Sequence, residues 1–393
     1  MNEKKSLWLK FGIIVAMVML FIAILIIGKR MNMKKFADYK EDQGSTPYIK
    51  IVNFDEEQQL VGEVIAEWLK GDASGKELYN RYSGKGKVYS ARLVTIQYSI
   101  YDIPSNVEVK DQKVELSENN SFEDSRIFEF EGNNRKVQFE YLYTNRIYYV
   151  RITVNMTDGT TIATTTQFKT AETPRIISTE GVWNMRDIGG PQTLYGQTLK
   201  QGLVYRGVEL DGAVYNKYCI TEAGIKVLTK ELGIKTEIDI RGKKANTKDM
   251  LGSNVDHKVY ESIYAYSDSL IPAYFDNYRQ LFSDLAKEEN YPVYIHCSYG
   301  KDRTGTVIYL LQLLLGVPEE DAYREWELSV LLDGILDYEP MEAYIENLKK
   351  LDGDTMQEKV ENHLLAIGVT RAEIESIRVI LIENYISDLN GFQ

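Results

Sequence analysis

A cysteine and an arginine that are separated by five residues have the clearest chemical potential in this chain. They lie in the segment 296–305, which reads His-Cys-Ser-Tyr-Gly-Lys-Asp-Arg-Thr-Gly. Where such a segment leads into a helix, the helix dipole and the charge of Arg303 lower the pKa of Cys297 and keep its thiol ionised. A thiolate that faces a bound phosphate ester can attack phosphorus and form a phosphocysteine, which water then hydrolyses.

The residues around this pair predict a loop that binds a phosphate group. A buried strand is expected over 292–296, and a strongly apolar helix over 304–315. Backbone N–H groups at a helix start bind anions, and Gly300 and Gly305 allow the backbone to come close. The planar fork of Arg303 matches two phosphate oxygens. The alternative is a buried core cysteine beside ordinary turn glycines, which explains neither the flanking elements nor the Arg-Thr-Gly ending.

Four separated motifs occur in order along the second half of the chain. Residues 184–190 read Asn-Met-Arg-Asp-Ile-Gly-Gly, 205–207 read Tyr-Arg-Gly, 238–241 read Ile-Asp-Ile-Arg, and 300–305 read Gly-Lys-Asp-Arg-Thr-Gly. Together they resemble the bacterial protein tyrosine and lipid phosphatase family, within the cysteine-dependent tyrosine phosphatase superfamily. The resemblance covers residues 174–390 and departs from the family at two positions. Met185 replaces an aromatic residue, and Tyr299 stands where a small residue is usual.

The resemblance implies an α/β fold with a central, mainly parallel sheet flanked by helices, and a phosphomonoester hydrolase that uses no metal and no cofactor. Cys297 would be the nucleophile, and Arg303 would bind the phosphate. Expelling a tyrosine or inositol oxygen also needs a proton donor, and the chain lacks the Trp-Pro-Asp tripeptide of the phosphatases of higher organisms. The resemblance therefore implies that Asp302 is the general acid. The alternative is that Asp302 orients Arg303 or caps the helix.

Five further loop residues are expected to bind the phosphate or the substrate. They are Ser298, Tyr299, Gly300, Lys301 and Thr304. The resemblance implies that Lys301 binds additional phosphates on an inositol ring, and the alternative is a solvated surface lysine. Thr304 could donate its hydroxyl to the thiolate or cap the helix. The bulk of Tyr299 affects the depth and selectivity of the pocket.

Residues before the loop and on other predicted strands are expected to support it. His296 is expected to hydrogen-bond near the backbone of the nucleophile and tune the thiolate, rather than act as a base or a metal ligand. Asp239 and Arg241 end a strand whose C-terminal edge should face the site. They either support the loop or pair with each other, and the same two alternatives apply to Arg186 and Asp187.

The segment 47–172 is expected to be an all-β domain. Alternating polar and apolar residues predict half-buried antiparallel strands, with a hairpin at Asp158-Gly159. The strand patterns lie at 92–98, 136–141, 148–154 and 160–168. Leu142 followed by Tyr148 and Val150 resembles the tyrosine corner of a fibronectin type III-like sandwich, although another immunoglobulin-like sandwich would look much the same. A helix-like stretch at 56–70 has no evident place in such a sandwich.

The segment 173–393 carries the loop and the four motifs and is therefore expected to be the catalytic domain. Strand and helix patterns alternate along it, which is typical of an α/β domain. Besides the strand and helix that flank the loop, a buried strand is expected over 234–240. Further helices are expected over 221–232, 318–332, 341–351 and 370–387. This order predicts a three-layer domain with a central sheet.

An apolar run at 11–28 contains 18 residues without a charge. As a helix it would span roughly 27 Å, close to the thickness of a bilayer core. It has no small-residue cleavage pattern after it, so an uncleaved transmembrane anchor over 1–30 is favoured over a signal peptide. Residues 31–46 then read as a linker. Lysine and arginine are nearly balanced on the two sides of the run, and the sandwich favours a catalytic domain outside the bacterial cell membrane.

Composition excludes several classes of protein. The net charge of −12 and pI near 5.0 argue against nucleic acid as a partner. Two cysteines exclude a disulfide scaffold, and with only three histidines they make a structural zinc site improbable. The expected partners are therefore a phosphorylated protein or a phosphoinositide, together with the membrane. A binding protein without turnover, a sulfurtransferase and an arsenate reductase are the alternatives.

Overall fold

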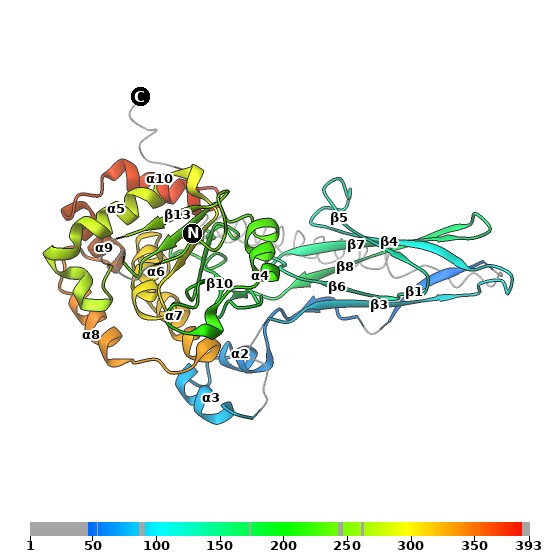
Figure 1. The fold of residues 1–393 in the computed structure, drawn as a ribbon, viewed down its shortest axis with the longest axis horizontal. Coiled ribbons are helices and arrows are strands. Elements are labelled where there is room, and N and C mark those ends of the chain that lie inside the picture. The colour runs from blue at the N-terminus through cyan, green and yellow to red at the C-terminus, as the bar shows by residue number, and fades with distance from the viewer. Residues whose placement is uncertain are drawn as a thin grey trace, which may run out of the picture. The chain divides into compact units, whose positions relative to one another are not determined.

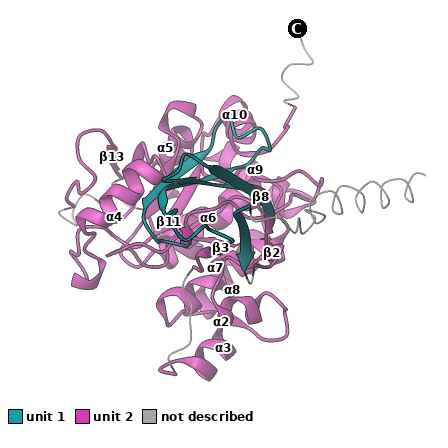
Figure 2. Cartoon of the chain, turned by 90° about the vertical axis from the view of Figure 1, so that its right-hand side faces the viewer, with its two compact units in different colours: residues 1–53, 97–135, 149–167 teal, residues 54–96, 136–148, 168–393 magenta. Residues whose placement is uncertain are grey.

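The computed structural model describes most of the 393-residue chain. The described residues are 46–52, 54–85, 91–172, 174–242, 247–260 and 263–386. The expected membrane helix at 11–28 and nearly all of the linker lie outside them, and no helix within them is long and apolar enough to cross a bilayer. The chain divides into two compact units, which Figure 2 shows in different colours. Unit 1 comprises residues 1–53, 97–135 and 149–167, and unit 2 comprises 54–96, 136–148 and 168–393.

The N-terminal strands form two sheets (Figure 1). The first has the order β1 (Tyr48–Val52), β3 (Val94–Tyr101), β6 (Lys136–Phe139). The second has the order β2 (Glu57–Gln58), β8 (Thr161–Thr170), β7 (Ile147–Met156), β4 (Val109–Ser117), β5 (Arg126–Glu131). β1 pairs with β3, and β4 with both β5 and β7, in antiparallel register. The strands expected within 47–172 are thus observed, but the segment is not all-β, because it also contains the helices Glu63–Trp68 and Gly75–Tyr82.

A side-chain hydrogen bond joins the two sheets within unit 1. In unit 1 the buried Tyr98 hydroxyl of β3 donates a 2.6 Å hydrogen bond to Gln112 Oε1 of β4, on the other sheet. Successive residues of β7 alternate between buried and less buried positions, as the sequence predicts. β7 and β8 are neighbours, and the Met156 N–H donates to the Thr160 carbonyl at 2.8 Å, so the predicted hairpin forms.

The predicted tyrosine corner also has its hydrogen bond. Tyr148 is buried, and its hydroxyl accepts a 2.9 Å hydrogen bond from the backbone N–H of Tyr143. This contact fixes the chain just before it enters β7. The assignment of the sandwich to the fibronectin type III class stays a prediction.

A six-stranded sheet forms the centre of the α/β part of unit 2. Its order is β13 (Asp256–Val259), β12 (Thr236–Asp239), β14 (Val293–His296), β11 (Val204–Gly207), β10 (Arg186–Asp187), β9 (Arg175–Ile176). The first four strands are parallel, and the last two pairings are antiparallel. The prediction of a mainly parallel sheet is confirmed.

Helices cover both faces of this sheet. Tyr294 of β14 packs into one core with Leu228, which follows α4 (Glu222–Lys226). The flanking Val293 and Ile295 pack into the other core. That second core contains the helices α5 (Phe275–Leu285), α6 (Asp302–Leu314), α7 (Glu319–Asp333), α8 (Glu339–Leu348), α9 (Met356–Ala366) and α10 (Arg371–Leu381). The three-layer arrangement follows from strand residues that alternate between faces.

Several helices differ from their predicted form. The helix expected over 221–232 is α-helical only through Lys226 and continues as a π-helix over Val227–Glu231. The helices α5 and α9 were not predicted, although Thr355 and Glu358 form a capping box at the start of α9. Such a box is a sequence signal for a helix start and could have revealed α9.

The helix-like stretch at 56–70 contains α2 (Glu63–Trp68), which is followed by α3 (Gly75–Tyr82). Both belong to unit 2, and their buried side chains join the core of the α/β part. The Trp68 indole donates a 2.9 Å hydrogen bond to Glu327 Oε2 of α7. Residues that precede most of the sandwich in the sequence therefore complete the core of the α/β part.

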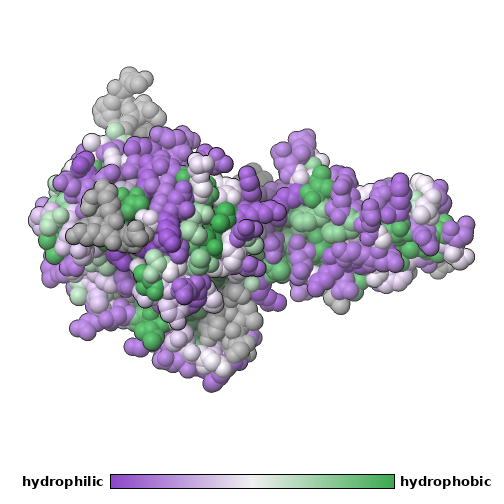
Figure 3. Space-filling model, viewed as in Figure 1, coloured by the Kyte–Doolittle hydropathy of each residue, from purple (hydrophilic) through white to green (hydrophobic). Residues whose placement is uncertain are grey.

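Hydrophilic residues cover most of the face seen in Figure 3, and apolar residues show between them in separate groups. Some single apolar side chains are strongly exposed, among them Ile335. Scattered exposure of this kind is normal for a folded protein.

Candidate active site

The loop that carries the cysteine connects β14 to α6, as the sequence predicts. Gly300 has a φ of 64°, and a Cβ there would lie 2.2 Å from the carbonyl oxygen of Gly207 at the end of β11. A Cβ on Gly305 would lie 2.6 Å from Trp326 Cδ1 of α7. Both positions therefore require glycine, because any side chain would displace the loop from the strand or helix that supports it.

Cys297 is buried, with 3% of its surface exposed. Burial alone would raise the pKa of its thiol, but the positive charge of Arg303, together with Thr304, outweighs this and lowers the pKa. The Thr304 hydroxyl makes no hydrogen bond within the described residues, so the charge of Arg303 is the main cause of the lowered pKa. The thiol is thus biased toward the thiolate that a nucleophile requires.

The guanidinium of Arg303 is fixed by two contacts. Its Nη1 donates to the backbone carbonyl of Arg241 at 3.1 Å, and its Nη2 donates to Ser298 Oγ at 3.3 Å. These contacts use only part of the donor set of an arginine. The remaining N–H groups are available to an anion bound at the loop.

The Asp302 carboxyl is held by a residue that sequence reasoning did not single out. Tyr266, in the 3-10 helix Tyr266–Leu270, donates a 2.6 Å hydrogen bond from its hydroxyl to Asp302 Oδ1. Asp302 begins α6 and is partly exposed. It thus stands at the edge of the loop, where a leaving group could be reached.

Lys301 and Tyr299 lie on the outer side of the loop. The Lys301 ammonium donates to the backbone carbonyl of Asp333 at 2.8 Å and lies 3.5 Å from the Asp333 carboxylate, at the end of α7. Tyr299 is 41% exposed and packs edge-on against Tyr218, with ring centroids 5.9 Å apart. Lys301 is therefore tied to α7 rather than free in solvent, and Tyr299 forms part of an aromatic rim.

Asp239 and Arg241 do pair, as one alternative proposed, but Arg241 also supports the loop. Its guanidinium donates to Asp239 Oδ2 at 2.7 Å, to Glu209 Oε2 at 2.8 Å and to Asp211 Oδ1 at 2.7 Å. Burial alone would lower the pKa of Arg241, but Asp239 and Asp211 outweigh it and raise the pKa, so the group stays charged. Because the backbone carbonyl of Arg241 accepts a hydrogen bond from Arg303, the cluster fixes the Arg303 guanidinium.

Arg186 and Asp187 point to different partners. Arg186 Nε donates to Glu325 Oε1 of α7 at 2.7 Å, and its Nη1 donates to Asn184 Oδ1 at 2.6 Å. Asp187 accepts a 2.8 Å hydrogen bond from Arg175 and lies away from this contact. Arg186 thus supports the site through neighbours, and Asp187 fixes β9 to β10.

Those neighbours reach the loop backbone. Asn184 Nδ2 donates to the carbonyls of Tyr299 and Gly300, each at 3.2 Å. Arg206 Nη2 also donates to the Gly300 carbonyl, and its Nη1 donates to Glu325 Oε2 at 2.6 Å. With these carbonyls occupied by donors, the loop N–H groups can face a bound anion.

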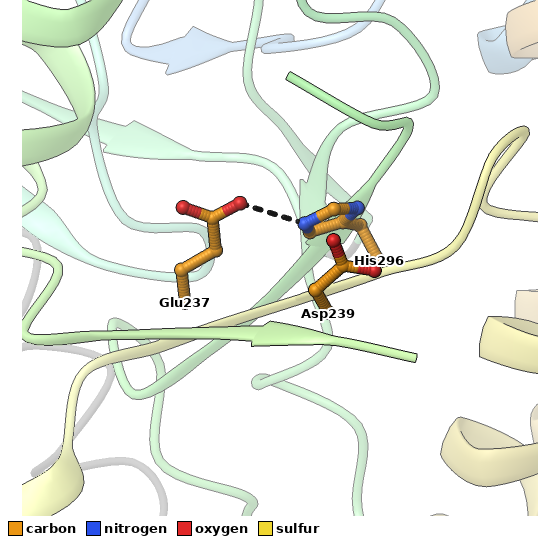
Figure 4. Close-up of side chains that lie close together, drawn as sticks. All are labelled: Glu237, Asp239 and His296. Atoms are coloured by element: carbon orange, nitrogen blue, oxygen red, sulfur yellow. Dashed lines mark hydrogen bonds and ion pairs between the residues drawn. The ribbon is translucent and has the colours of Figure 1, made fainter. Parts of the chain in front are cut away.

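His296 is fully buried beneath the loop. Its Nε2 lies 2.9 Å from Glu237 Oε1 (Figure 4). Its Nδ1 lies 3.2 Å from the Cys297 carbonyl. Burial alone would disfavour the imidazolium, but Asp239 and Glu237 outweigh it and raise the pKa of His296. The imidazole thus lies next to the backbone of Cys297, as the sequence predicts.

Glu237, Asp239 and His296 could each offer one ligand atom, and these atoms lie within 4.8 Å of one another. Figure 4 shows that one Glu237 oxygen points at the imidazole and the other points away from it. The carboxylates instead bond to protein groups, since Asp239 binds Arg241 and Glu237 binds His296. The absence of a metal stays a prediction.

Sequence reasoning missed several residues of this site. They are Asn184, Arg206, Glu209, Tyr266 and Glu325. Asn184 and Arg206 lie inside two of the ordered motifs, and that position was the available signal. The other three carry no local pattern, because only the fold brings them to the loop.

The arrangement combines a thiol with a lowered pKa and a fixed guanidinium in a loop between a strand and a helix, which suits the binding and hydrolysis of a phosphate ester. Comparisons with known proteins agree with a phosphatase. The model of the tyrosine phosphatase family matches residues 177–383, more than half of the chain, so the chain belongs to that family. A tyrosine-protein phosphatase of Nostoc commune is 30% identical over 121 residues, which cover 25% of this chain and 41% of that relative. The match thus spans less than half of the relative.

Proposed function

We propose that this protein is a cysteine-dependent phosphomonoester hydrolase with Cys297 as its nucleophile. The observation that carries the proposal is a buried thiol with a lowered pKa, next to a guanidinium fixed by Ser298 and the Arg241 carbonyl. Membership of the tyrosine phosphatase family supports it.

The proposed reaction has two steps. The Cys297 thiolate attacks phosphorus, so that an S–P bond forms while the P–O bond to the leaving group breaks. Asp302 gives its proton to the departing oxygen. Water then attacks the phosphocysteine, its proton passes to the Asp302 carboxylate, and the S–P bond breaks to release phosphate. Arg303 binds the phosphate oxygens throughout.

The substrates we propose are phosphotyrosine in proteins and, as a second class, phosphoinositides. The family and the name of the Nostoc commune relative favour the first class. Lys301 beside the loop favours the second, although its ammonium is held by Asp333 before any ligand binds. A phosphate-release panel of phosphopeptides and mono-, bis- and tris-phosphoinositides separates the two classes.

Cys297→Ser is the direct test of the mechanism. A serine hydroxyl is far less ionised than this thiol, so we expect hydrolysis of p-nitrophenyl phosphate to fall to background while phosphate-ester binding survives. Cys219→Ser is the matched control, because Cys219 is an exposed thiol outside the loop, and it should keep full activity. Turnover by Cys297→Ser would refute the mechanism, and binding without turnover by the unaltered protein would indicate a phospho-ligand-binding protein.

The remaining parts of the chain are proposed to place this enzyme outside the cell membrane. The apolar run at 11–28 would be a single-pass anchor, and the sandwich a fibronectin type III-like spacer. The tyrosine-corner hydrogen bond and the antiparallel pairing of β1 with β3 and of β4 with β5 and β7 support the spacer. Protease treatment of intact cells tests the orientation, since an external domain is cleaved and an internal one is protected.

A further inference from the structure

The proposed general acid is held by a tyrosine from a separate element. The Tyr266 hydroxyl donates to Asp302 Oδ1 at 2.6 Å, and Tyr266 itself is 9% exposed. Within the described residues, Oδ1 is the only carboxyl oxygen of Asp302 that has a hydrogen-bond donor. A proton carried by this carboxyl would therefore sit on Oδ2, because Oδ1 already accepts from the phenol.

A second connection runs through the backbone. The Tyr266 N–H donates to Thr306 Oγ1 at 2.8 Å, and the Thr306 hydroxyl donates to the Asp302 carbonyl at 2.9 Å. Tyr266 thus contacts Asp302 directly through its side chain and, through Thr306, at its main chain. Two contacts at different atoms restrict both the position and the rotation of the carboxyl.

The conformation of Tyr266 is itself unusual. Its φ is 55°, in the left-handed region that bulky residues rarely adopt. Its ring packs edge-on against Trp326 and Tyr344, with centroids 6.5 Å away in each case. A strained backbone that the surroundings hold in place is typical of functional sites.

The phenol stays a donor under working conditions. Burial raises the pKa of Tyr266, and the nearby charges of Asp302 and Cys297 raise it further. The hydroxyl therefore remains protonated and neutral when Asp302 loses its proton to the leaving group. The same hydrogen bond can then stabilise the carboxylate that forms.

We propose that Tyr266 is a positioning residue for catalysis, which occupies Asp302 Oδ1 and so directs the transferable proton on Oδ2 toward the leaving-group oxygen. This inference rests on the proposed role of Asp302 as general acid. Tyr266 itself does not contact the reacting atoms.

The test uses the full chain and two aryl phosphates that differ in their leaving group. Phenyl phosphate needs protonation of the departing oxygen, whereas p-nitrophenyl phosphate hardly does. We expect Tyr266→Phe to lower kcat/KM for phenyl phosphate by about tenfold, the value of one well-placed hydrogen bond. For p-nitrophenyl phosphate we expect almost no change. In an Asp302→Asn background, Tyr266→Phe should have no further effect on either substrate.

Two further variants control for folding. Tyr309→Phe removes a buried hydroxyl from α6 that has no hydrogen-bond partner within the described residues. It should leave kcat/KM unchanged for both substrates. Should Tyr266→Phe not fold, Thr306→Val breaks the second connection instead. It should likewise lower kcat/KM for phenyl phosphate and leave kcat/KM for p-nitrophenyl phosphate almost unchanged.

The outcomes separate this inference from the function on which it rests. Equal losses on both substrates, or a loss that persists in the Asp302→Asn background, would overturn the role of Tyr266 alone. An Asp302→Asn variant that shows no leaving-group selectivity would overturn both this role and the assignment of the acid. Turnover by Cys297→Ser would refute the mechanism as a whole.

Discussion

At the scale of single residues, the ionisation of Cys297 is decided by opposing effects. Burial favours the neutral thiol, and Arg303 favours the thiolate strongly enough to lower the pKa. In the proposed mechanism the thiolate is the attacking form, so activity should increase as pH rises through this lowered pKa. Any change that removes the charge of Arg303 should move the onset of thiolate formation to higher pH.

Alkylation of Cys297 measures this onset without requiring turnover. We expect the rate of iodoacetamide modification, followed by peptide mass spectrometry to distinguish Cys297 from Cys219, to rise with pH. In Arg303→Gln the midpoint of this rise should move to higher pH, because burial raises the pKa of the Cys297 thiol and the charge of Arg303 no longer opposes it. Arg279→Gln removes a half-exposed arginine from α5 and should leave the midpoint in place. An unchanged midpoint in Arg303→Gln would show that another group holds the thiolate.

At the scale of elements, helix α7 fixes the catalytic loop through one carboxylate. Glu325 binds Arg186 at 2.7 Å and Arg206 at 2.6 Å, and both guanidinium groups are buried. Burial and the neighbouring Arg206 lower the pKa of Arg186 to about 9, and Glu325 opposes this effect. Without Glu325, two buried cations would face each other beside the Gly300 carbonyl.

Glu325→Gln should therefore destabilise the fold and the loop together. Removing one partner of a buried ion pair costs about 3–5 kcal/mol, so we expect a loss near this value in the free energy of unfolding, measured with denaturant. The catalytic constant should fall as well, because Arg206 and Asn184 position the loop carbonyls. Glu320→Gln on the exposed side of the same helix is the control and should change neither quantity. A fully stable and active Glu325→Gln would show that the loop holds its form without α7.

At the scale of the whole molecule, unit 2 is assembled from segments that are far apart in the sequence. Trp68 of α2 is buried against α7, where its indole binds Glu327 and Arg324 stacks on its ring at 4.2 Å. Leu78 of α3 lies in the same core. Residues 54–96 thus stabilise the helix that in turn stabilises the loop.

Trp68→Ala tests this dependence. Truncating a buried tryptophan costs about 3–5 kcal/mol, so we expect a loss of this size in the free energy of unfolding. Trp68→Phe keeps most of the packing and loses one hydrogen bond, for which we expect about 1–3 kcal/mol. Denaturant unfolding of the full chain measures both losses. Equal stability of both variants and the unaltered protein would mean that α2 merely covers the surface of α7.

The loop itself was predictable because its parts are contiguous in the sequence. A strand, two glycines, a cysteine and an arginine within ten residues indicate a strand–loop–helix anion site. The position of His296 and the mainly parallel sheet followed from the same patterns. The switch from α4 to a π-helix was not predictable, since it depends on how Leu228 and Leu232 pack in their core.

The sequence by itself thus determined the family and the loop with Cys297 and Arg303 between a strand and a helix. Only the tertiary structure decided what holds that loop, because the supporting contacts join distant residues. Tyr266 binds Asp302 across 36 positions, Asn184 binds Gly300 across 116, and Trp68 binds Glu327 across 259. Local preferences are encoded over a few residues, whereas a hydrogen bond between two buried groups exists only after chain folding has brought both out of water.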